Sequence, residues 1–100
     1  MKTGIELIAE ERQRQVSAEG FDASHDDAYK QDELVRAAFC YMAYSSRCKE
    51  AISDSMWPWH LDWWKPKDKK TDLIRAGALI AAEIDRINRL PPNDQIQRAP

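Results

Sequence analysis

His25, Asp26 and Asp27 follow one another in the sequence and could bind a metal ion or transfer a proton. A histidine nitrogen is a common metal ligand and a common proton acceptor near neutral pH. A metal centre built on this motif needs further histidines, and His60 is the only other one in the chain. We therefore expect these residues to cap a turn or to make a hydrogen bond between two elements.

Four acidic residues on two expected helices raise a second possibility, a Mg²⁺ site. The chain resembles in class the all-α nucleotide pyrophosphohydrolases of the MazG type. These enzymes place an E-x-x-E pair and an E-x-x-D pair on facing helices, so that successive turns direct oxygen atoms at the cation. Here Glu6 and Glu10 are four residues apart, and Glu83 and Asp85 are two apart and split across faces. We expect solvated helix faces and keep the pyrophosphohydrolase as an alternative.

Other catalytic patterns are missing from the sequence. Neither Cys40 nor Cys48 has an adjacent base that would make it a nucleophile, and we expect Cys40 to lie in the core. The chain has no phosphate-binding G-x-x-x-x-G-K-[ST] loop, no G-x-S-x-G motif and no zinc spacing. We therefore predict a protein that is not an enzyme, with no catalytic residue, no metal and no cofactor.

The four tryptophans lie within eight residues, in the segment WPWHLDWW. Exposed tryptophans are typical of binding interfaces, whereas a domain this small also needs large rings to complete its core. Trp57 and Trp59 flank Pro58, so we expect that the two do not both point inward. We predict that most of the rings are core and name Trp57 and Trp59 as candidate partner-binding residues.

The charged residues form one acidic and one basic segment. Residues 19–33 contain six acidic residues and only one lysine, whereas the segment WWKPKDKK is rich in lysine. The lysines could follow a phosphate backbone beside stacking tryptophans, or could simply be solvated. Carboxylates on a small rigid scaffold can enter a basic channel built for nucleic acid, or can form an acid-rich loop before a helix. The candidate partner-binding acids are Asp22, Asp26, Asp27, Asp32 and Glu33.

The elements that position these groups are predicted to be helices. Residues 3–19 begin with a capping box, Thr3-x-x-Glu6, and Gly20 follows as a left-handed residue. Residues 20–31 are expected to be a loop with a short turn that Ser24 could cap. A second helix is expected over residues 32–46.

The last helix is expected to start near Asp68 or Thr71 and to end at Leu90 before two prolines. It carries an apolar stripe at helical spacing, in which Gly77 should permit close approach of another helix. The fold class is therefore all-α, a small single domain of about three main helices. An irregular Trp-rich loop joins the second and third of these helices. Residues 1–90 form the domain, and residues 91–100 are expected to be a flexible tail.

Composition limits the function further. The chain has 100 residues, a formal net charge of −2 and no apolar run long enough for a membrane span. The small negative charge argues against a protein that binds nucleic acid by bulk charge. We expect a reduced, soluble, intracellular protein without a signal peptide.

Three segments, ERQRQVSAEGFDASHDD, DELVRAAFCYMAY and WPWHLDWWKPKDKKTDLIRAGALIAAEIDRI, resemble a family of small phage and prophage proteins that includes a type I-F anti-CRISPR inhibitor. The similarity covers residues 5–90. It implies a non-catalytic inhibitor, acting in the cytoplasm of the bacterial host, that binds the type I-F surveillance (Csy, or Cascade) complex.

The resemblance also implies a place and a mode of binding. The protein would bind near the junction of the large subunit and the adjoining backbone subunit, and would block unwinding or hybridisation of target DNA. Direct DNA binding and membrane association are not expected. The alternatives are the pyrophosphohydrolase and a small nucleic-acid-binding phage module.

Overall fold

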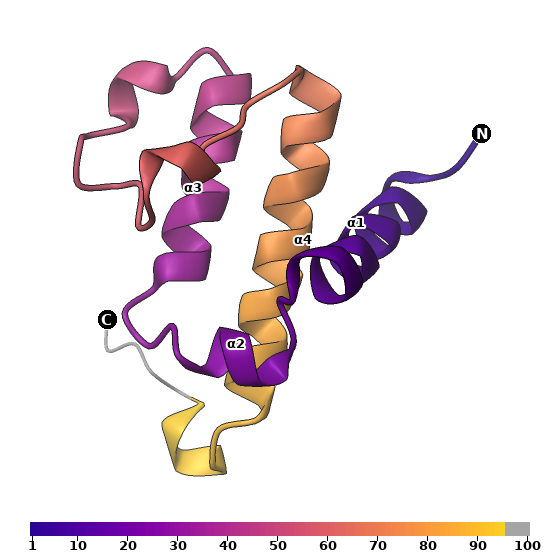
Figure 1. Cartoon of the computed structure of the whole chain (residues 1–100), viewed down its shortest axis with the longest axis vertical. Coiled ribbons are helices and arrows are strands. Elements are labelled where there is room, and N and C mark those ends of the chain that lie inside the picture. The colour runs from indigo at the N-terminus through magenta and orange to yellow at the C-terminus, as the bar shows by residue number, and fades with distance from the viewer. Residues whose placement is uncertain (96–100) are drawn as a thin grey trace.

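The computed structural model describes residues 1–95, and this part of the chain is helical, without a strand. Helices α3 and α4 lie side by side, and α1 crosses α4 from the other side (Figure 1). The all-α fold with three main helices is confirmed. The α-helices are α1 (Gly4–Glu19), α2 (Ala23–Asp27), α3 (Glu33–Ser45) and α4 (Lys69–Asn88), and the 3₁₀ turns are Lys49–Ala51, Leu61–Trp63 and Pro92–Asp94.

Helix α1 begins and ends as its sequence predicts. The Thr3 hydroxyl accepts the Glu6 backbone N–H at 3.2 Å, and the Glu6 carboxylate accepts the Thr3 N–H at 2.8 Å, which completes the capping box. Both bonds satisfy N–H groups that have no partner within a helix. Gly20 has φ 75° and ends the helix in the left-handed conformation.

The core lies between α3 and α4 and is built mainly from small side chains. Leu34 and Tyr41 of α3 pack against Leu79 of α4, and the alanines between them let the two backbones approach closely. Cys40 is fully buried, as predicted. The core alanines are Ala37, Ala38, Ala76 and Ala82.

Helix α4 starts where its sequence indicates, since the Asp68 carboxylate accepts the Thr71 backbone N–H at 2.7 Å. Its apolar stripe is only half covered: Leu73 is 41% exposed and Ile84 is 53% exposed, because the alanines face α3 instead. Gly77 allows α1 to pack closely against α4. A Cβ atom there would lie 2.6 Å from Cδ1 of Ile8, so the close approach predicted for this glycine is confirmed.

The short helix α2 packs against the C-terminal half of α4 (Figure 1). Its N-cap is Asp22, whose carboxylate accepts the His25 backbone N–H at 2.9 Å. The expected Ser24 cap is therefore wrong by two residues. An aspartate is an equally good N-cap, and the helix starts at the first such residue after the Gly20 turn.

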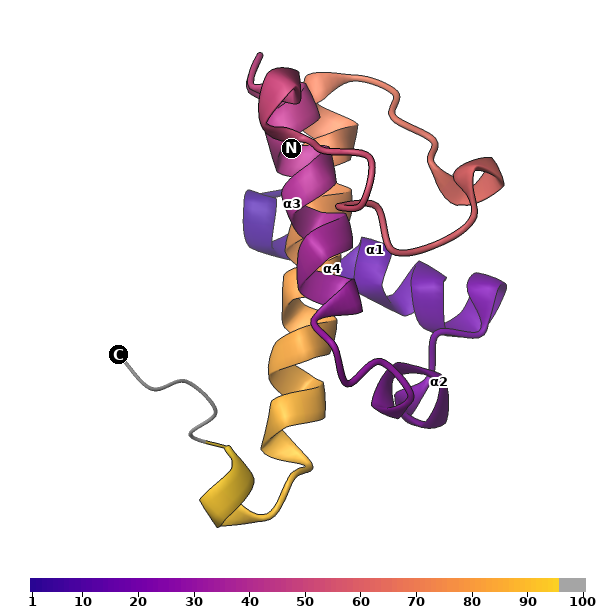
Figure 2. The same cartoon turned by 90° about the vertical axis from the view of Figure 1, so that its left-hand side faces the viewer.

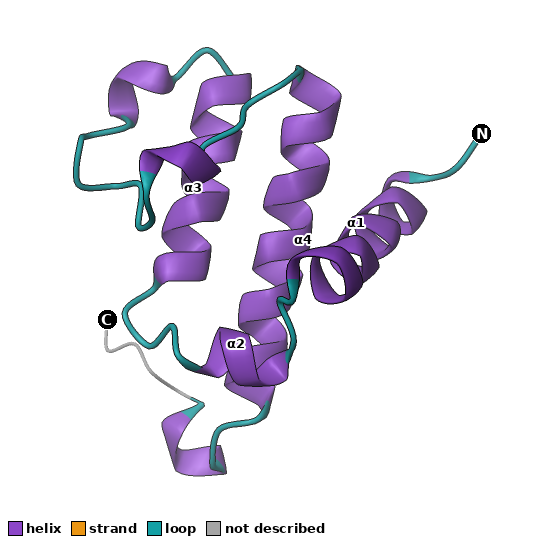
Figure 3. Ribbon diagram, in the orientation of Figure 1, coloured by secondary structure: helices purple, strands orange, loops and turns teal. Residues whose placement is uncertain are grey.

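The Trp segment, residues 57–64, belongs to the long connection between α3 and α4 (teal in Figure 3). Trp57, Trp59 and Trp64 pack against the core, while Trp63 is 55% exposed. The expectation that Trp57 and Trp59 would not both point inward is wrong. Their rings meet edge to face, with centroids 5.4 Å apart, so both fit on the same side of the core.

Residues 92–94 of the expected tail form a 3₁₀ turn, and the Gln95 side chain donates to the Leu90 carbonyl at 2.9 Å. This part of the tail therefore folds back onto the end of α4. The rest of the predicted flexible tail, residues 96–100, lies outside the described residues. None of the described helices is long and apolar enough to cross a membrane.

Candidate functional site

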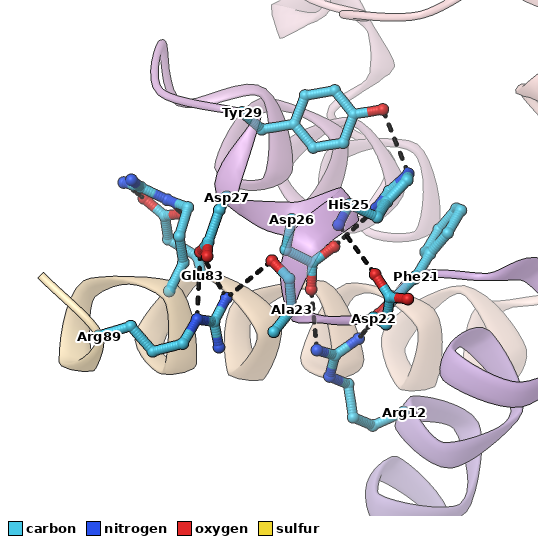
Figure 4. Close-up of polar contacts among 11 residues, drawn as sticks. Arg12, Phe21, Asp22, Ala23, His25, Asp26, Asp27, Tyr29, Glu83 and Arg89 are labelled. Atoms are coloured by element: carbon cyan, nitrogen blue, oxygen red, sulfur yellow. Dashed lines mark hydrogen bonds and ion pairs between the residues drawn. The ribbon is translucent and has the colours of Figure 1, made fainter.

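Asp26 is fully buried and ties α2 to α1 (Figure 4). Its carboxylate accepts a hydrogen bond of 2.8 Å from the Arg12 guanidinium, which also donates to the Phe21 carbonyl at 3.1 Å. A buried carboxylate needs such a partner, because desolvation of a lone charge is costly. Asp26 is thus unavailable to a partner surface, and its assignment as a partner-binding residue is corrected.

His25 continues this network toward the Trp segment. Its Nδ1 lies 2.8 Å from an Asp26 carboxylate oxygen, and its Nε2 lies 3.2 Å from the Tyr29 hydroxyl (Figure 4). An ionised carboxylate only accepts, so Nδ1 is the donor toward Asp26, and in the neutral imidazole Nε2 then accepts from the Tyr29 hydroxyl. Burial and the charges of Asp26 and Glu33 raise the pKa of Tyr29 and outweigh the opposing effect of Trp59, so the hydroxyl stays protonated. The hydrogen-bonding role predicted for the His25 motif is confirmed, with Asp26 making the bond between elements.

Asp27 faces the last turn of α4. The Arg89 guanidinium donates to one Asp27 oxygen from two nitrogens, at 2.7 and 3.1 Å (Figure 4). This hydrogen bonding, which outweighs a small effect of burial, lowers the pKa of Asp27. The negative charge of Asp27 is therefore offset within the molecule.

The three remaining acids of the candidate set form no ion pair with a residue of the described chain: Asp22, Asp32 and Glu33. Asp22 caps α2, and Asp32 stands immediately before α3 with φ 64°. Glu33 is half-buried and accepts the Gln31 backbone N–H at 2.7 Å. The acidic surface is therefore smaller than the sequence indicates.

A cavity of about 700 Å³ opens between α1, α2 and the Trp segment. We call it the aromatic cavity, because six aromatic side chains besides His25 and His60 line it. The Trp segment and the C-terminal half of α1 extend to the same side of the α3–α4 pair (Figure 2). These lining rings are Phe21, Tyr29, Tyr41, Trp57, Trp59 and Trp63.

The wall that α1 contributes to the aromatic cavity carries acceptors. Glu11 accepts two hydrogen bonds of 2.8 Å from Arg14, and Arg14 also pairs with Glu19 at 3.0 Å. Burial raises the pKa of Glu11, but the hydrogen bonds of Arg14 and Gln15 and the charges of Arg14 and Arg75 outweigh it, so the pKa is lowered. Glu11 therefore stays ionised at neutral pH.

Two cations, Lys65 and Arg75, also line the aromatic cavity. Arg75 lies over the Tyr41 ring, 5.9 Å from its centroid, and donates to the Lys65 carbonyl. The Lys65 backbone N–H in turn donates to the Tyr41 hydroxyl at 3.4 Å. Burial raises the pKa of Tyr41, despite this bond and the charge of Arg75. Within residues 1–95, neither Lys65 nor Arg75 forms an ion pair.

Three of the four acids of the expected helix faces have structural partners, whereas Asp85 is exposed and forms no ion pair within residues 1–95. Glu6 belongs to the capping box of α1, and Glu10 pairs with Lys2. Glu83 is buried and accepts hydrogen bonds from Arg86 at 2.7 and 3.0 Å. Over residues 1–95, no group of three or more His, Cys, Asp and Glu side chains could hold a metal ion.

Several cavity residues were not singled out from the sequence: Glu11, Arg14, Gln15, Glu19 and Arg75. The residues Glu11, Gln15 and Glu19 do recur every four positions, which places them on one face of α1. The same spacing is found on an ordinary solvated helix face, so it does not identify these three residues as cavity residues. The arrangement as a whole can bind a ligand or a partner through rings and paired charges.

Comparison of the chain with protein-family models, with curated proteins and with solved structures gave no match.

Proposed function

We propose that the protein is a phage-encoded, non-catalytic inhibitor of type I-F CRISPR interference. It binds the surveillance complex at the junction of the large subunit and the adjoining backbone subunit, and it excludes target DNA. It acts in the cytoplasm of the bacterial host. The proposal is supported by the resemblance of three segments to the small phage and prophage proteins described above.

The observation that carries the proposal in structural terms is the division of the acids in residues 19–33. Asp26 and Asp27 are neutralised by arginines, whereas Asp22, Asp32 and Glu33 are not. All three lie in one short stretch around α2 and the start of α3. Carboxylates without an internal partner are the ones that can meet lysines and arginines of a channel built for nucleic acid.

The size of the molecule favours a steric mode of action. The described residues span 38 × 33 × 26 Å, and the formal charge of the chain is −2. A mimic of duplex DNA would carry many more negative charges, because the duplex has about one charge per 1.7 Å of its axis. A compact protein with a local acidic surface is better suited to blocking the DNA-binding channel sterically.

The acidic surface is tested with a variant that removes three charges and keeps the local structure. Asn retains capping at position 22 and tolerates the left-handed conformation at position 32. The variant is Asp22→Asn, Asp32→Asn and Glu33→Gln. The matched control removes three charges from the connection between α3 and α4: Glu50→Gln, Asp54→Asn and Asp62→Asn.

We expect the first variant to bind the purified Csy complex about tenfold more weakly at physiological salt, chiefly through slower association. The control variant should bind as the wild type does. Equal affinities of all three proteins would contradict a contact through Asp22, Asp32 and Glu33.

The mode of inhibition is tested by order of addition. The protein should bind the Csy complex alone and fail to bind a complex that already holds hybridised target DNA. Simultaneous binding of both would contradict the proposal.

Two further assays address the alternatives. Release of pyrophosphate from dNTPs with Mg²⁺ or Mn²⁺ would indicate the hydrolase, and a salt-sensitive shift of DNA by the isolated protein would indicate the nucleic-acid-binding module.

A further inference from the structure

The aromatic cavity has the size and the walls of a small-molecule site. Its volume of about 700 Å³ lies within the range of about 300–1,000 Å³ typical of ligand pockets. Its rings touch one another from Phe21 through Trp59 to Trp57 and Tyr41. Trp63 differs from these, because it is half exposed at the cavity and stacks on no other ring of residues 1–95. Its face is therefore available to a flat ligand.

Two buried polar atoms of the cavity-lining residues lack a hydrogen-bond partner in the described part of the chain. They are Oε1 of Gln15, an acceptor, and Nε1 of Trp59, a donor. Gln15 is only 3% exposed, and its Nε2 is already used, since it donates to Glu11 at 3.2 Å. Nε1 of Trp59 already lies close enough to the Tyr29 hydroxyl to oppose the rise in the pKa of Tyr29, so Oε1 of Gln15 is the atom that a ligand donor, such as the amino group of a heterocyclic base, would satisfy.

The aromatic cavity is lined by charges of both signs. On one wall, Arg14 is shared by Glu11 and Glu19, which leaves that wall rich in acceptors. Elsewhere in the lining, Lys65 and Arg75 form no ion pair within residues 1–95, although the charge of Arg75 also acts on Glu11. The acceptors suit amino groups, and the two cations suit a phosphate.

From these three features we infer that the aromatic cavity binds a nucleotide, with an amino-bearing base against the rings and α1 and the phosphate against Lys65 and Arg75. The nucleotide is either free or part of a single strand. This site is separate from Asp22, Asp32 and Glu33, so the inference does not rest on the proposed inhibition.

The binding test uses the full-length protein labelled with ¹⁵N and titrated with AMP. Each tryptophan gives one indole N–H signal, and the signals of Trp57, Trp59 and Trp63 should shift together. Trp64 does not line this cavity and should shift least, which makes it an internal control. Adenosine, which lacks the phosphate, and UMP, whose base lacks an amino group, should both bind more weakly than AMP. The inference is overturned if adenosine binds as well as AMP, or if neither millimolar AMP nor a short single-stranded oligonucleotide shifts any of the three signals.

Two lysines of the same segment provide matched variants. Lys65 lines the cavity and Lys67 does not, and both are exposed, so neither substitution should impair folding. Lys65→Gln should weaken AMP binding about tenfold or more, the effect of one charged hydrogen bond, and should leave adenosine unaffected. Lys67→Gln should change neither. Equal effects of the two variants would overturn the placement of the phosphate.

The source of the nucleotide is decided by a parallel titration with a short single-stranded oligonucleotide. If AMP shifts the three indole signals, the ligand is a free nucleotide. If only the oligonucleotide shifts them, and Trp63→Ala abolishes the shift, the ligand is a nucleotide within a strand. If neither shifts them, the inference is wrong.

Discussion

Asp26 is the acidic residue whose surroundings differ most from those of its neighbours in the sequence. Asp22, Asp27 and Asp32 are exposed, whereas Asp26 is buried between His25 and Arg12. A buried charge pair is strongly destabilised when one partner is removed, because the other remains desolvated. The role of Asp26 is therefore to hold α2 on α1.

Replacement of Asp26 tests this role. Asp26→Asn should lower the free energy of unfolding by about 3–5 kcal/mol, because Arg12 loses its buried counter-charge. The control Asp32→Asn removes an exposed carboxylate without an ion pair and should stay within about 0.5 kcal/mol of the wild type. Urea unfolding followed by circular dichroism measures both. A loss below about 1 kcal/mol for Asp26→Asn, the size of an ordinary hydrogen bond, would contradict the argument.

Glu11 gives the protein a predictable response to acid. Its pKa is lowered from 4.5 in the folded state, since the contacts with Arg14 and Gln15 outweigh burial. The stabilisation by ionised Glu11 is therefore complete above pH 4.5 and is lost as the pH falls through the lower folded-state pKa. Glu11→Gln should cost about 1–2 kcal/mol at neutral pH, less than a fully buried charged hydrogen bond, because Arg14 is half exposed to solvent.

The difference in unfolding free energy between the wild type and Glu11→Gln should shrink as the pH falls below 4.5. Denaturant titrations at several pH values measure it. Glu50→Gln, which removes an exposed glutamate without an ion pair, serves as the control. A difference that grows in acid would refute the sign of this argument.

At this scale the sequence predicts contacts between near neighbours and misses those between distant residues. The capping box of Thr3 and Glu6 was predicted correctly, and the start of α4 was placed near Asp68 or Thr71, because each depends on residues three positions apart. The pairs of Arg12 with Asp26 and of Arg89 with Asp27 span 14 and 62 positions. Nothing in a local pattern specifies which arginine will meet which acid.

Among the elements, the crossing of α1 and α4 depends on Gly77 and Ile8. A Cβ atom at Gly77 would lie 2.6 Å from Cδ1 and 2.9 Å from Cγ1 of Ile8. Alanine is favoured over glycine inside a helix by about 1 kcal/mol. The clash and the helix propensity therefore act in opposite directions at this position.

A double-mutant cycle separates the two effects. Gly77→Ala should destabilise the wild type by about 1 kcal/mol, because the overpacking exceeds the gain in helix propensity. In the Ile8→Ala background, the same substitution should stabilise the protein by about 1 kcal/mol, because only the propensity remains. Thermal unfolding of the four proteins measures the change of sign. The same sign in both backgrounds would show that Ile8 does not limit the approach.

Helix α4 also shows where periodicity stops being informative. Its stripe of Leu73, Ile80 and Ile84 predicts a helix, and the helix is present. Which face of α4 is buried depends on the element that packs against it. The alanine face is buried because α3 can approach closely there. Hydrophobic periodicity alone does not tell whether close packing of alanines or looser packing of isoleucines stabilises the helix pair more.

For the molecule as a whole, the Trp segment replaces core that three helices cannot supply. Trp57 contacts Tyr41, Trp59 and Trp64 through its ring, and its Nε1 donates to the His60 carbonyl at 3.1 Å. The connection therefore has no independent stability and should unfold together with the helices.

Unfolding should accordingly be a single transition. Tryptophan fluorescence, which reports the connection, and far-ultraviolet circular dichroism, which reports the helices, should give the same midpoint in urea. Trp57→Ala should lower that midpoint, with a cost of about 2–3 kcal/mol for removing a large, partly buried ring that packs against the core. An earlier fluorescence transition in the wild type would show instead that the Trp segment detaches first.

The sequence predicted the helical fold at this scale but not the aromatic cavity. The cavity combines one face of α1, the His25 motif, the Trp segment and Arg75. Each part looks ordinary when taken alone, as a solvated helix face, a turn or a lysine-rich connection. Only the crossing of α1 over α4 brings them together, and that crossing follows from tertiary packing.

The bond between Arg89 and Asp27 has a consequence for biosynthesis. Asp27 leaves the ribosome 62 residues before its partner, so α2 is held at first by Arg12 alone. The second anchor forms only when the final turn of α4 has been made. A chain interrupted before Arg89 would therefore lack the second anchor of α2, and this corner of the protein closes only after the last turn of α4 has formed.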